Sequence, residues 1–274
     1  MKLTADIVGE AAGPVEQTLD RRWLMAYSAG LGETDARCYD SEPSVHPLFP
    51  VCYEWPASQP LRRLPALQAL NPRLIHAQHD VAIHRPLRAG ETIRTSSRIV
   101  AAEQRSPGAF VVYRFETRGS DSEPVTTSDF GALYRGVQLS GEARRIEALE
   151  DPPQPGSLNL IGEIDIAATA AHVYTECARI WNPIHTDRAY ARAAGLPDII
   201  LHGTATLALS ISRALATFRI DWNAVRRARC RFTGMVLMPS VLSVHAARSA
   251  NMVEFETRNP GGDAVIRRGQ LLLQ

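Results

Sequence analysis

The chain has 274 residues, of which 45% are hydrophobic, and 30 Lys and Arg residues stand against 29 Asp and Glu residues. A chain of this length can bury a large core, and a near-neutral balance argues against nucleic acid or an anionic membrane as the main partner. The N-terminus has no apolar signal-peptide core, and no apolar run reaches the roughly eighteen residues of a membrane span. We therefore expect a cytoplasmic protein.

The first part of the chain predicts two helices followed by strands. Residues 17–32 place Trp23, Leu24, Tyr27 and Leu31 on one helical side, and a second apolar segment runs from Pro47 to about 64. Turn residues then separate four runs typical of strands, at 74–87, 91–104, 109–119 and 126–137. This order indicates two helices and an antiparallel meander.

The same order returns in the second part of the chain. Helical segments between 173 and 218 precede strand-like runs at 228–236, 240–249, 252–259 and 264–274. Between the two parts lies EALEDPPQPGSLN, which is rich in proline and acid and is typical of a linker. We predict an α+β protein with an internal repeat, divided into 1–150, a linker at 151–157, and 158–274.

Histidines and cysteines could suggest a metal site, but their spacing disfavours one. On a regular strand His76 and His79 point to opposite faces, and His84 lies too far along to join them. We expect His76 to be a satisfied interior residue, and His79 and His84 to lie towards solvent or between the two halves. The four cysteines have no C-x-x-C spacing, so we expect buried thiols, no metal and no cofactor: Cys38, Cys52, Cys177 and Cys230.

The most informative stretch is 179–207. Asn182 precedes a proline, so its backbone is expected to be extended and to make Asn182–His185 an overhang. Thr186 can cap a short helix through Arg192, and a longer helix begins at Thr204 after a His-Gly turn. The first N–H groups of that helix, with Gly203 allowing close approach, suit an oxygen that becomes negative during a reaction.

The motifs NPIH at 182–185 and ILHG at 200–203 resemble those of MaoC-type dehydratases and R-specific enoyl-CoA hydratases. In that family an Asp and a His activate water for addition to the double bond of an enoyl thioester. The resemblance implies a double hot-dog fold, in which each of two long helices is wrapped by an antiparallel β-sheet. It also implies that His185 is the catalytic histidine, Asn182 the motif asparagine, and Gly203 the N–H donor to the thioester oxygen.

The corresponding N-terminal loop, 28–39, has no Asn-Pro-x-His, so we expect one site, in the second half. The resemblance implies that the first half then widens the acyl pocket. Other residues of the overhang are candidates for substrate binding: Trp181, Pro183, Ile184 and His202. Trp181 could line the acyl entrance or only pack, and His202 could hold the turn or touch a ligand. Arg227, Arg229 and Arg231 share one strand face, which is either solvated or a contact for the phosphates of coenzyme A or carrier-protein pantetheine.

One position departs from the family pattern. The catalytic Asp of the family falls on Ile180, which cannot accept a proton, so His185 would act alone or with Glu176, Asp187 or Asp198. We expect reversible hydration of 2-enoyl thioesters carried on coenzyme A or acyl carrier protein. The alternatives are an acyl-thioester binding protein, or a thioesterase or acyl-transfer enzyme that has lost hydratase chemistry. Whether two chains form a homodimer stays open.

Overall fold

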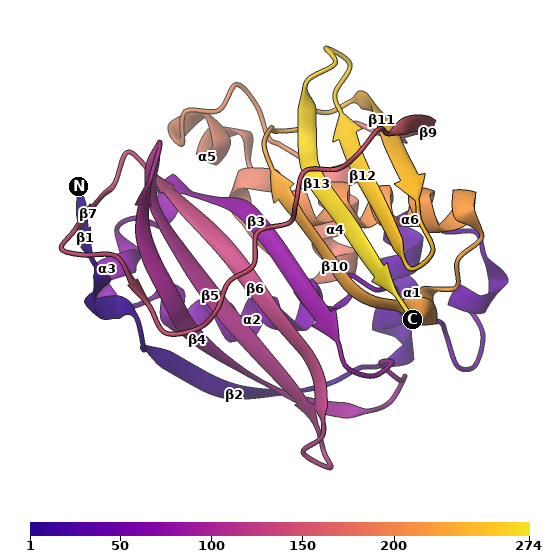
Figure 1. Cartoon of the computed structure of the whole chain (residues 1–274), viewed down its shortest axis with the longest axis horizontal. Helices are drawn as coiled ribbons and strands as arrows, with labels where there is room; N and C mark the ends of the chain where they lie inside the picture. Colours follow the sequence, from indigo (N-terminus) through magenta and orange to yellow (C-terminus); the bar gives the residue numbers. More distant parts are fainter.

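The computed structural model describes all residues, 1–274, and is built around an 11-stranded antiparallel sheet (Figure 1). The first half contributes five strands in the order β2 (Ala11–Thr18), β4 (Thr92–Arg105), β5 (Gly108–Gly119), β6 (Pro124–Arg135) and β3 (Leu74–Ile83). The second half continues with β10 (Val225–Phe232), β13 (Ala264–Leu273), β12 (Met252–Arg258), β11 (Ser240–Arg248) and β9 (Asn159–Ile166). The short β8 (Arg144–Arg145) pairs with β4, and β1 (Lys2–Thr4) and β7 (Gln138–Ser140) form a separate parallel pair.

The helices cover one face of this sheet, as Figure 1 shows. The first half holds α1 (Arg21–Gly30), α2 (Pro50–Arg62) and α3 (Pro65–Gln68), and the second holds α4 (Ala170–Ala178), α5 (Arg188–Ala193) and α6 (Gly203–Phe218). Short 3₁₀ turns complete the chain: η1 (Ala5–Ile7), η2 (Ala36–Cys38), η3 (Asn71–Arg73), η4 (Pro183–His185) and η5 (Trp222–Ala224). None of the helices is both long enough and apolar enough to cross a membrane.

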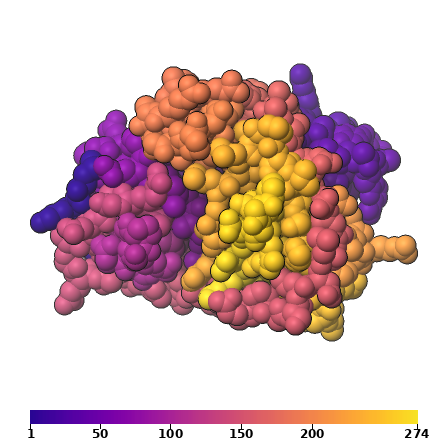
Figure 2. Space-filling view, turned by 90° about the horizontal axis from the view of Figure 1, so that it is seen from above, coloured from indigo at the N-terminus to yellow at the C-terminus, as the bar shows by residue number.

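The two halves form one body. Strand β3 pairs with β10 in antiparallel register, with His79 opposite Cys230, so the sheet runs without a break from one half into the other. Behind the sheet α1 packs on α4, and the rings of Tyr27 and Tyr174 lie 5.8 Å apart between centroids. The halves lie side by side in Figure 2 as well. This is the double hot-dog arrangement, with α2 and α6 as the central helices.

The sequence predicted eight of the strands but not the two at the ends of the sheet. Strand β2 contains Gly13 and Pro14, and β9 contains Gly162 at a positive φ of 148°, at a break in register between β9 and β11. Glycine and proline interrupt the alternation on which strand prediction depends, and edge positions tolerate both residues. Edge pairing within one chain joins the two halves, while association of two chains remains a prediction.

The four cysteines are free. Cys38, Cys52 and Cys230 are buried, and Cys177 is partly buried where α4 meets α1. A side chain in place of Gly30 would bring its Cβ within 2.8 Å of the Cys177 Cβ, so the two helices are in close contact at this point. Cys177 therefore packs between the halves, as a small apolar residue does.

Candidate active site

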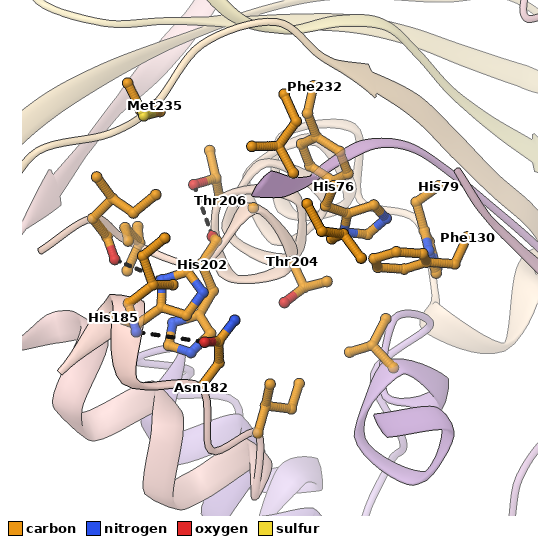
Figure 3. Close-up of a pocket in the computed structure, with 18 of the residues that line it drawn as sticks. His76, His79, Phe130, Asn182, His185, His202, Thr204, Thr206, Phe232 and Met235 are labelled. Atoms are coloured by element: carbon orange, nitrogen blue, oxygen red, sulfur yellow. Dashed lines mark hydrogen bonds between the residues drawn. The ribbon is translucent and has the colours of Figure 1, made fainter. Parts of the chain in front are cut away.

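A cavity of about 370 Å³ lies between the two halves. The overhang before α6 provides one wall, with Ile180, Asn182 and His185, and the start of α6 continues it. The first half provides the opposite wall from α2, β3, β5 and β6. Figure 3 shows the residues of the overhang on one side of Thr204, and His76, His79 and Phe130 on the other. The cavity therefore depends on both halves of the chain.

The local sequence explains how the overhang is built. Helix α4 ends at Arg179, which adopts the left-handed conformation with φ 58°, and the chain then turns away from the helix. Asn182 is extended, with φ −124° and ψ 117°, as a residue before proline should be, and its Oδ1 accepts a hydrogen bond from the Ile184 N–H at 3.4 Å. Asp187, rather than Thr186, caps α5, because its carboxylate accepts from the N–H groups of two residues of the first turn.

His185 is held in a single tautomer. Its Nδ1 lies 2.8 Å from the carbonyl oxygen of Ile200, and because a carbonyl only accepts, Nδ1 carries the proton and donates. The Nε2 atom of the neutral ring therefore keeps a lone pair. Burial lowers the pKa of His185 to about 4, so the ring is neutral at pH 7. His185 lines the cavity as a neutral base.

His202 stands behind His185. The two rings are stacked with centroids 3.6 Å apart, and His202 Nε2 lies 3.3 Å from the Thr175 hydroxyl. His202 is 2% exposed; burial, with a smaller contribution from His185, holds its pKa well below the usual range. Of the two roles left open for His202, the structure supports holding the turn and the ring of His185, although part of the residue reaches the cavity wall.

The start of α6 offers free N–H donors. No side chain caps this helix, and its first internal hydrogen bond runs from the Thr206 N–H to the His202 carbonyl at 3.0 Å. The N–H groups of Gly203 and Thr204, both on the cavity wall, therefore have no partner inside the helix. A Cβ at Gly203 would lie 3.2 Å from the Phe232 ring, which explains why glycine fits here.

None of the three acids proposed from the sequence lines the cavity. Glu176 is exposed on α4, Asp187 caps α5, and Asp198 is exposed with a 3.2 Å contact to Arg188. Ile180, in the position of the family's Asp, is 6% exposed and forms part of the apolar wall.

One acid on the wall was missed. Glu54 on α2 is the carboxylic acid among the lining residues, and the Ser128 hydroxyl donates to it. Burial raises the pKa of Glu54 to about 7. The signal was present in the sequence as a single acid inside the apolar run VCYEW. Such an acid in a buried helix needs a functional or structural reason, because uncompensated burial of a charge is costly.

The expectation that His76 and His79 point to opposite faces was wrong. The register between β3 and β6 shifts between His76 and Gln78, and this irregularity brings both rings to the same region, 5.3 Å apart between centroids. His79 is 1% exposed rather than solvated, although it does lie where the halves join. Neither His79 nitrogen, nor the Nε2 of His76, has a hydrogen-bond partner in the protein, so His76 is not fully satisfied. His84 bonds the Thr127 hydroxyl at 2.9 Å near the surface.

The remaining candidates for substrate binding either line the cavity or lie outside it. Ile184 lines the cavity, whereas Pro183 is exposed outside it and Trp181 is 59% exposed. Arg229 and Arg231 do not reach the cavity, which corrects their assignment to substrate binding. Arg229 is 9% exposed and contacts Glu150 at 3.1 Å and Gln270 at 2.8 Å.

Arg231 pairs with Asp151, and Arg227 makes two contacts with Asp80, at 2.7 and 2.8 Å. The arginine face is therefore neither solvated nor free for phosphates. It instead holds the irregular segment 146–158 on the sheet face opposite the helices, where that segment is visible in Figure 1.

Comparison with known proteins agrees with this geometry. A family model of the MaoC like domain matches residues 159–263, and one of the FAS1-like dehydratase domain region matches residues 6–128. The enoyl-CoA hydratase ChsH3 of Mycobacterium tuberculosis is 23% identical over 282 residues, covering 98% of both chains. The peroxisomal multifunctional enzyme type 2 of Mus musculus is 23% identical over 212 residues, which are 75% of this chain.

The chain spans only 28% of the length of that mouse enzyme. Among solved structures, a MaoC-like dehydratase from Phytophthora capsici superposes with a TM-score of 0.81 at 20% identity, covering 97% of this chain and 96% of that one. At that identity the likeness shows the fold alone. Residues 159–263 thus carry a MaoC-like domain and residues 6–128 a FAS1-like dehydratase region, in a chain with the double hot-dog fold of MaoC-like proteins.

Proposed function

We propose that the protein catalyses the reversible hydration of 2-enoyl thioesters to 3-hydroxyacyl thioesters, carried on coenzyme A or on an acyl carrier protein. One observation carries the proposal: His185 keeps its Nε2 lone pair on the wall of a cavity that also holds the uncapped start of α6. A base and an oxyanion site in one cavity are what addition of water to an enoyl thioester requires.

The chemistry follows from these positions. A water molecule held by Asn182 and His185 gives a proton to Nε2 while its oxygen bonds to C3 of the enoyl chain. The electrons of the double bond move towards the thioester oxygen, where the N–H groups of Gly203 and Thr204 stabilise the negative charge. The imidazolium then returns its proton to C2, and the reverse sequence expels water. With Ile180 on the wall, His185 serves as both base and acid in this scheme.

The cavity also suits an acyl chain. Its volume, about 370 Å³, lies in the usual range for small-molecule sites, roughly 300–1,000 Å³. Apolar side chains from both halves line it, among them Val51, Phe115 and Val265. The thioester would lie at the overhang and α6, with the acyl chain directed towards the first half.

Ile180 supports a second candidate. A buried isoleucine removes the acid that the resemblance expects, so the cavity could bind acyl thioesters without adding water. Attack of water on the thioester carbonyl at the start of α6 would be a third outcome, and it would release a free thiol, whereas hydration leaves the thioester intact.

The test follows crotonyl-CoA and a longer 2-enoyl-CoA by loss of absorbance from the conjugated thioester, with thiol release recorded in parallel. Hydration by the wild type, reduced about 10²–10⁴-fold in His185→Gln, is the expected result. Loss of absorbance at an equal rate in the variant would refute the role of His185. Binding without any absorbance change would favour the second candidate, and thiol release would favour the third.

A further inference from the structure

The cavity has a second polar region, on the wall that the first half provides. One member is Glu54, which is 4% exposed and lines the cavity from α2. The Ser128 hydroxyl donates to one carboxyl oxygen, and neither oxygen has a Lys, Arg or His partner in an ion pair. A carboxylic acid in this position costs stability unless something else uses it.

Two histidines line the same wall of the cavity as Glu54. Ser128 and Phe130 are alternate residues of β6 and so point to the same face. The Phe130 ring stacks on His76 at 3.9 Å, and His76 contacts His79 at 5.3 Å, both between centroids. Three ring nitrogens of this pair have no partner in the protein. Glu54, His76 and His79 therefore all line the wall that the first half provides, and Figure 3 shows the two histidines on the other side of Thr204 from His185.

A pocket for a plain alkyl chain would have no use for these groups. Apolar side chains at the same positions would pack better and would leave no polar atom unsatisfied. The part of α2 that lines the cavity carries an acid, whereas the part of α6 that lines it carries only the neutral polar residues Thr204 and Thr206. The acid on the wall of the first half therefore indicates a polar partner on the ligand.

We propose that this polar region binds a hydroxyl group on the acyl chain, beyond C3, with the hydroxyl donating to Glu54. The proposal rests on the proposed function, because it assigns the substrate class of the same site. A neutral donor suits the region better than an ion does. Arg62 lines the cavity together with Glu54, so the wall holds one basic and one acidic group whose opposite charges give no net preference for a cation or an anion.

The experiment measures binding of saturated acyl-CoAs by calorimetry, so that it does not depend on turnover. The probes are decanoyl-CoA and its hydroxy derivatives, with the hydroxyl stepped along the chain beyond C3, and the matching oxo derivatives. One hydroxy isomer should bind about ten- to 100-fold more tightly than decanoyl-CoA, the value of one hydrogen bond to a buried charged or polar group. The oxo isomer should bind less tightly, because it cannot donate.

Two variants test the assignment. Glu54→Leu should abolish the preference, so that decanoyl-CoA and the hydroxy isomer bind equally tightly, and Glu54→Gln, which keeps the shape and one acceptor, should retain part of it. Glu176→Gln, an exposed acid outside the cavity, is the matched control and should bind as the wild type does.

Each other outcome overturns the inference in a recognisable way. A preference that survives in Glu54→Leu would refute the role of Glu54. If decanoyl-CoA binds but no hydroxy isomer is preferred, the substrate class is wrong while the proposed function stands. If the variants lose decanoyl-CoA and the hydroxy isomer equally, Glu54 supports the cavity generally and selects nothing. If no acyl-CoA binds to the wild type, the proposed function fails together with the inference.

Discussion

Each half contains a segment between its first helix and its central helix. The two segments differ in their surroundings, because one is packed and the other borders the cavity. In the first half, residues 31–49 lie against α6, where His46 contacts Ser212 at 3.2 Å, and the His46 ring also lies 5.0 Å from the Trp222 ring of η5 between centroids. In the second half, residues 179–202 face α2 across the cavity. Each segment thus covers the central helix of the other half.

His46 and His185, one in each segment, show how a packed segment differs from a segment that borders the cavity. His46 is 1% exposed, its Nδ1 accepts from the Leu48 N–H at 3.0 Å, and its other nitrogen contacts Ser212. His185 uses Nδ1 in the protein and keeps Nε2 for the cavity. Both nitrogens of His46 are thus occupied within the fold, whereas the Nε2 atom of His185 is available for chemistry on the cavity wall.

The largest expected effect comes from changing these histidines in turn. His185→Gln should lower the rate of enoyl-CoA hydration about 10²–10⁴-fold, because the base is lost, with little change in melting temperature. His46→Gln should leave the rate per folded molecule unchanged and cost roughly 1–3 kcal/mol of stability, because buried partners lose their hydrogen bonds. Steady-state rates and thermal melts of both variants check the comparison, which fails if the two effects are exchanged.

Glu54 should make stability depend on pH. Its pKa is raised from 4.5 to about 7 in the folded protein, so the folded state holds the proton more tightly. The contribution to stability is complete below about pH 4.5 and is lost as the pH rises through 7. Glu54→Gln removes this loss and should be more stable than the wild type at about pH 8, by up to roughly 3 kcal/mol, with no difference at low pH. Denaturant unfolding at both values measures it; a variant less stable at high pH would contradict the burial argument.

Substitutions at two glycines distinguish the effect of packing in the cavity from the effect of packing between α1 and α4. Gly203→Ala places a methyl group 3.2 Å from the Phe232 ring and should lower kcat/KM about tenfold, since a shift of this size misplaces the N–H donors. Gly30→Ala meets the Cys177 Cβ at 2.8 Å and should cost about 1–3 kcal/mol by overpacking, with the rate per folded molecule retained. Equal losses of activity in both variants would show that the cavity is sensitive to the whole interface.

The smallest effect is expected from the arginines of β10. Arg231→Ala removes a partly exposed ion pair with Asp151, which is worth roughly 0–1 kcal/mol. The KM for a CoA thioester should stay within about twofold of the wild type, because Arg231 lies away from the cavity. A tenfold rise in KM without loss of stability would return Arg231 to the phosphate-binding role first considered for it.

The sequence was sufficient for the features that local chemistry dictates. The Asn182–Pro183 step and the start of α6 next to Gly203 depend on neighbouring residues, and the structure has both. Features set by distant partners could not be predicted. Glu54 reaches the cavity because α2 packs on the sheet, and the carboxylates of the linker, not their own strand, determine what Arg229 and Arg231 bind.

A break in strand register is the second reason why part of the site could not be predicted from the sequence. Alternation placed His76 and His79 on opposite faces, and the irregularity between His76 and Gln78 brought the rings together. One inserted residue reverses every inference from period two beyond it, and no residue in LIHAQHDV marks the place.

The unbroken pairing of β3 with β10 has a consequence for how such a site can change over generations. In an assembly of two identical subunits, every substitution appears twice, so a change that improves the acyl wall also alters the wall that carries the base. Here the two walls are encoded by separate stretches of one gene. Mutations that reshape the chamber around Glu54 leave the overhang of His185 as it was, so the range of acyl groups can diversify while the reaction is kept.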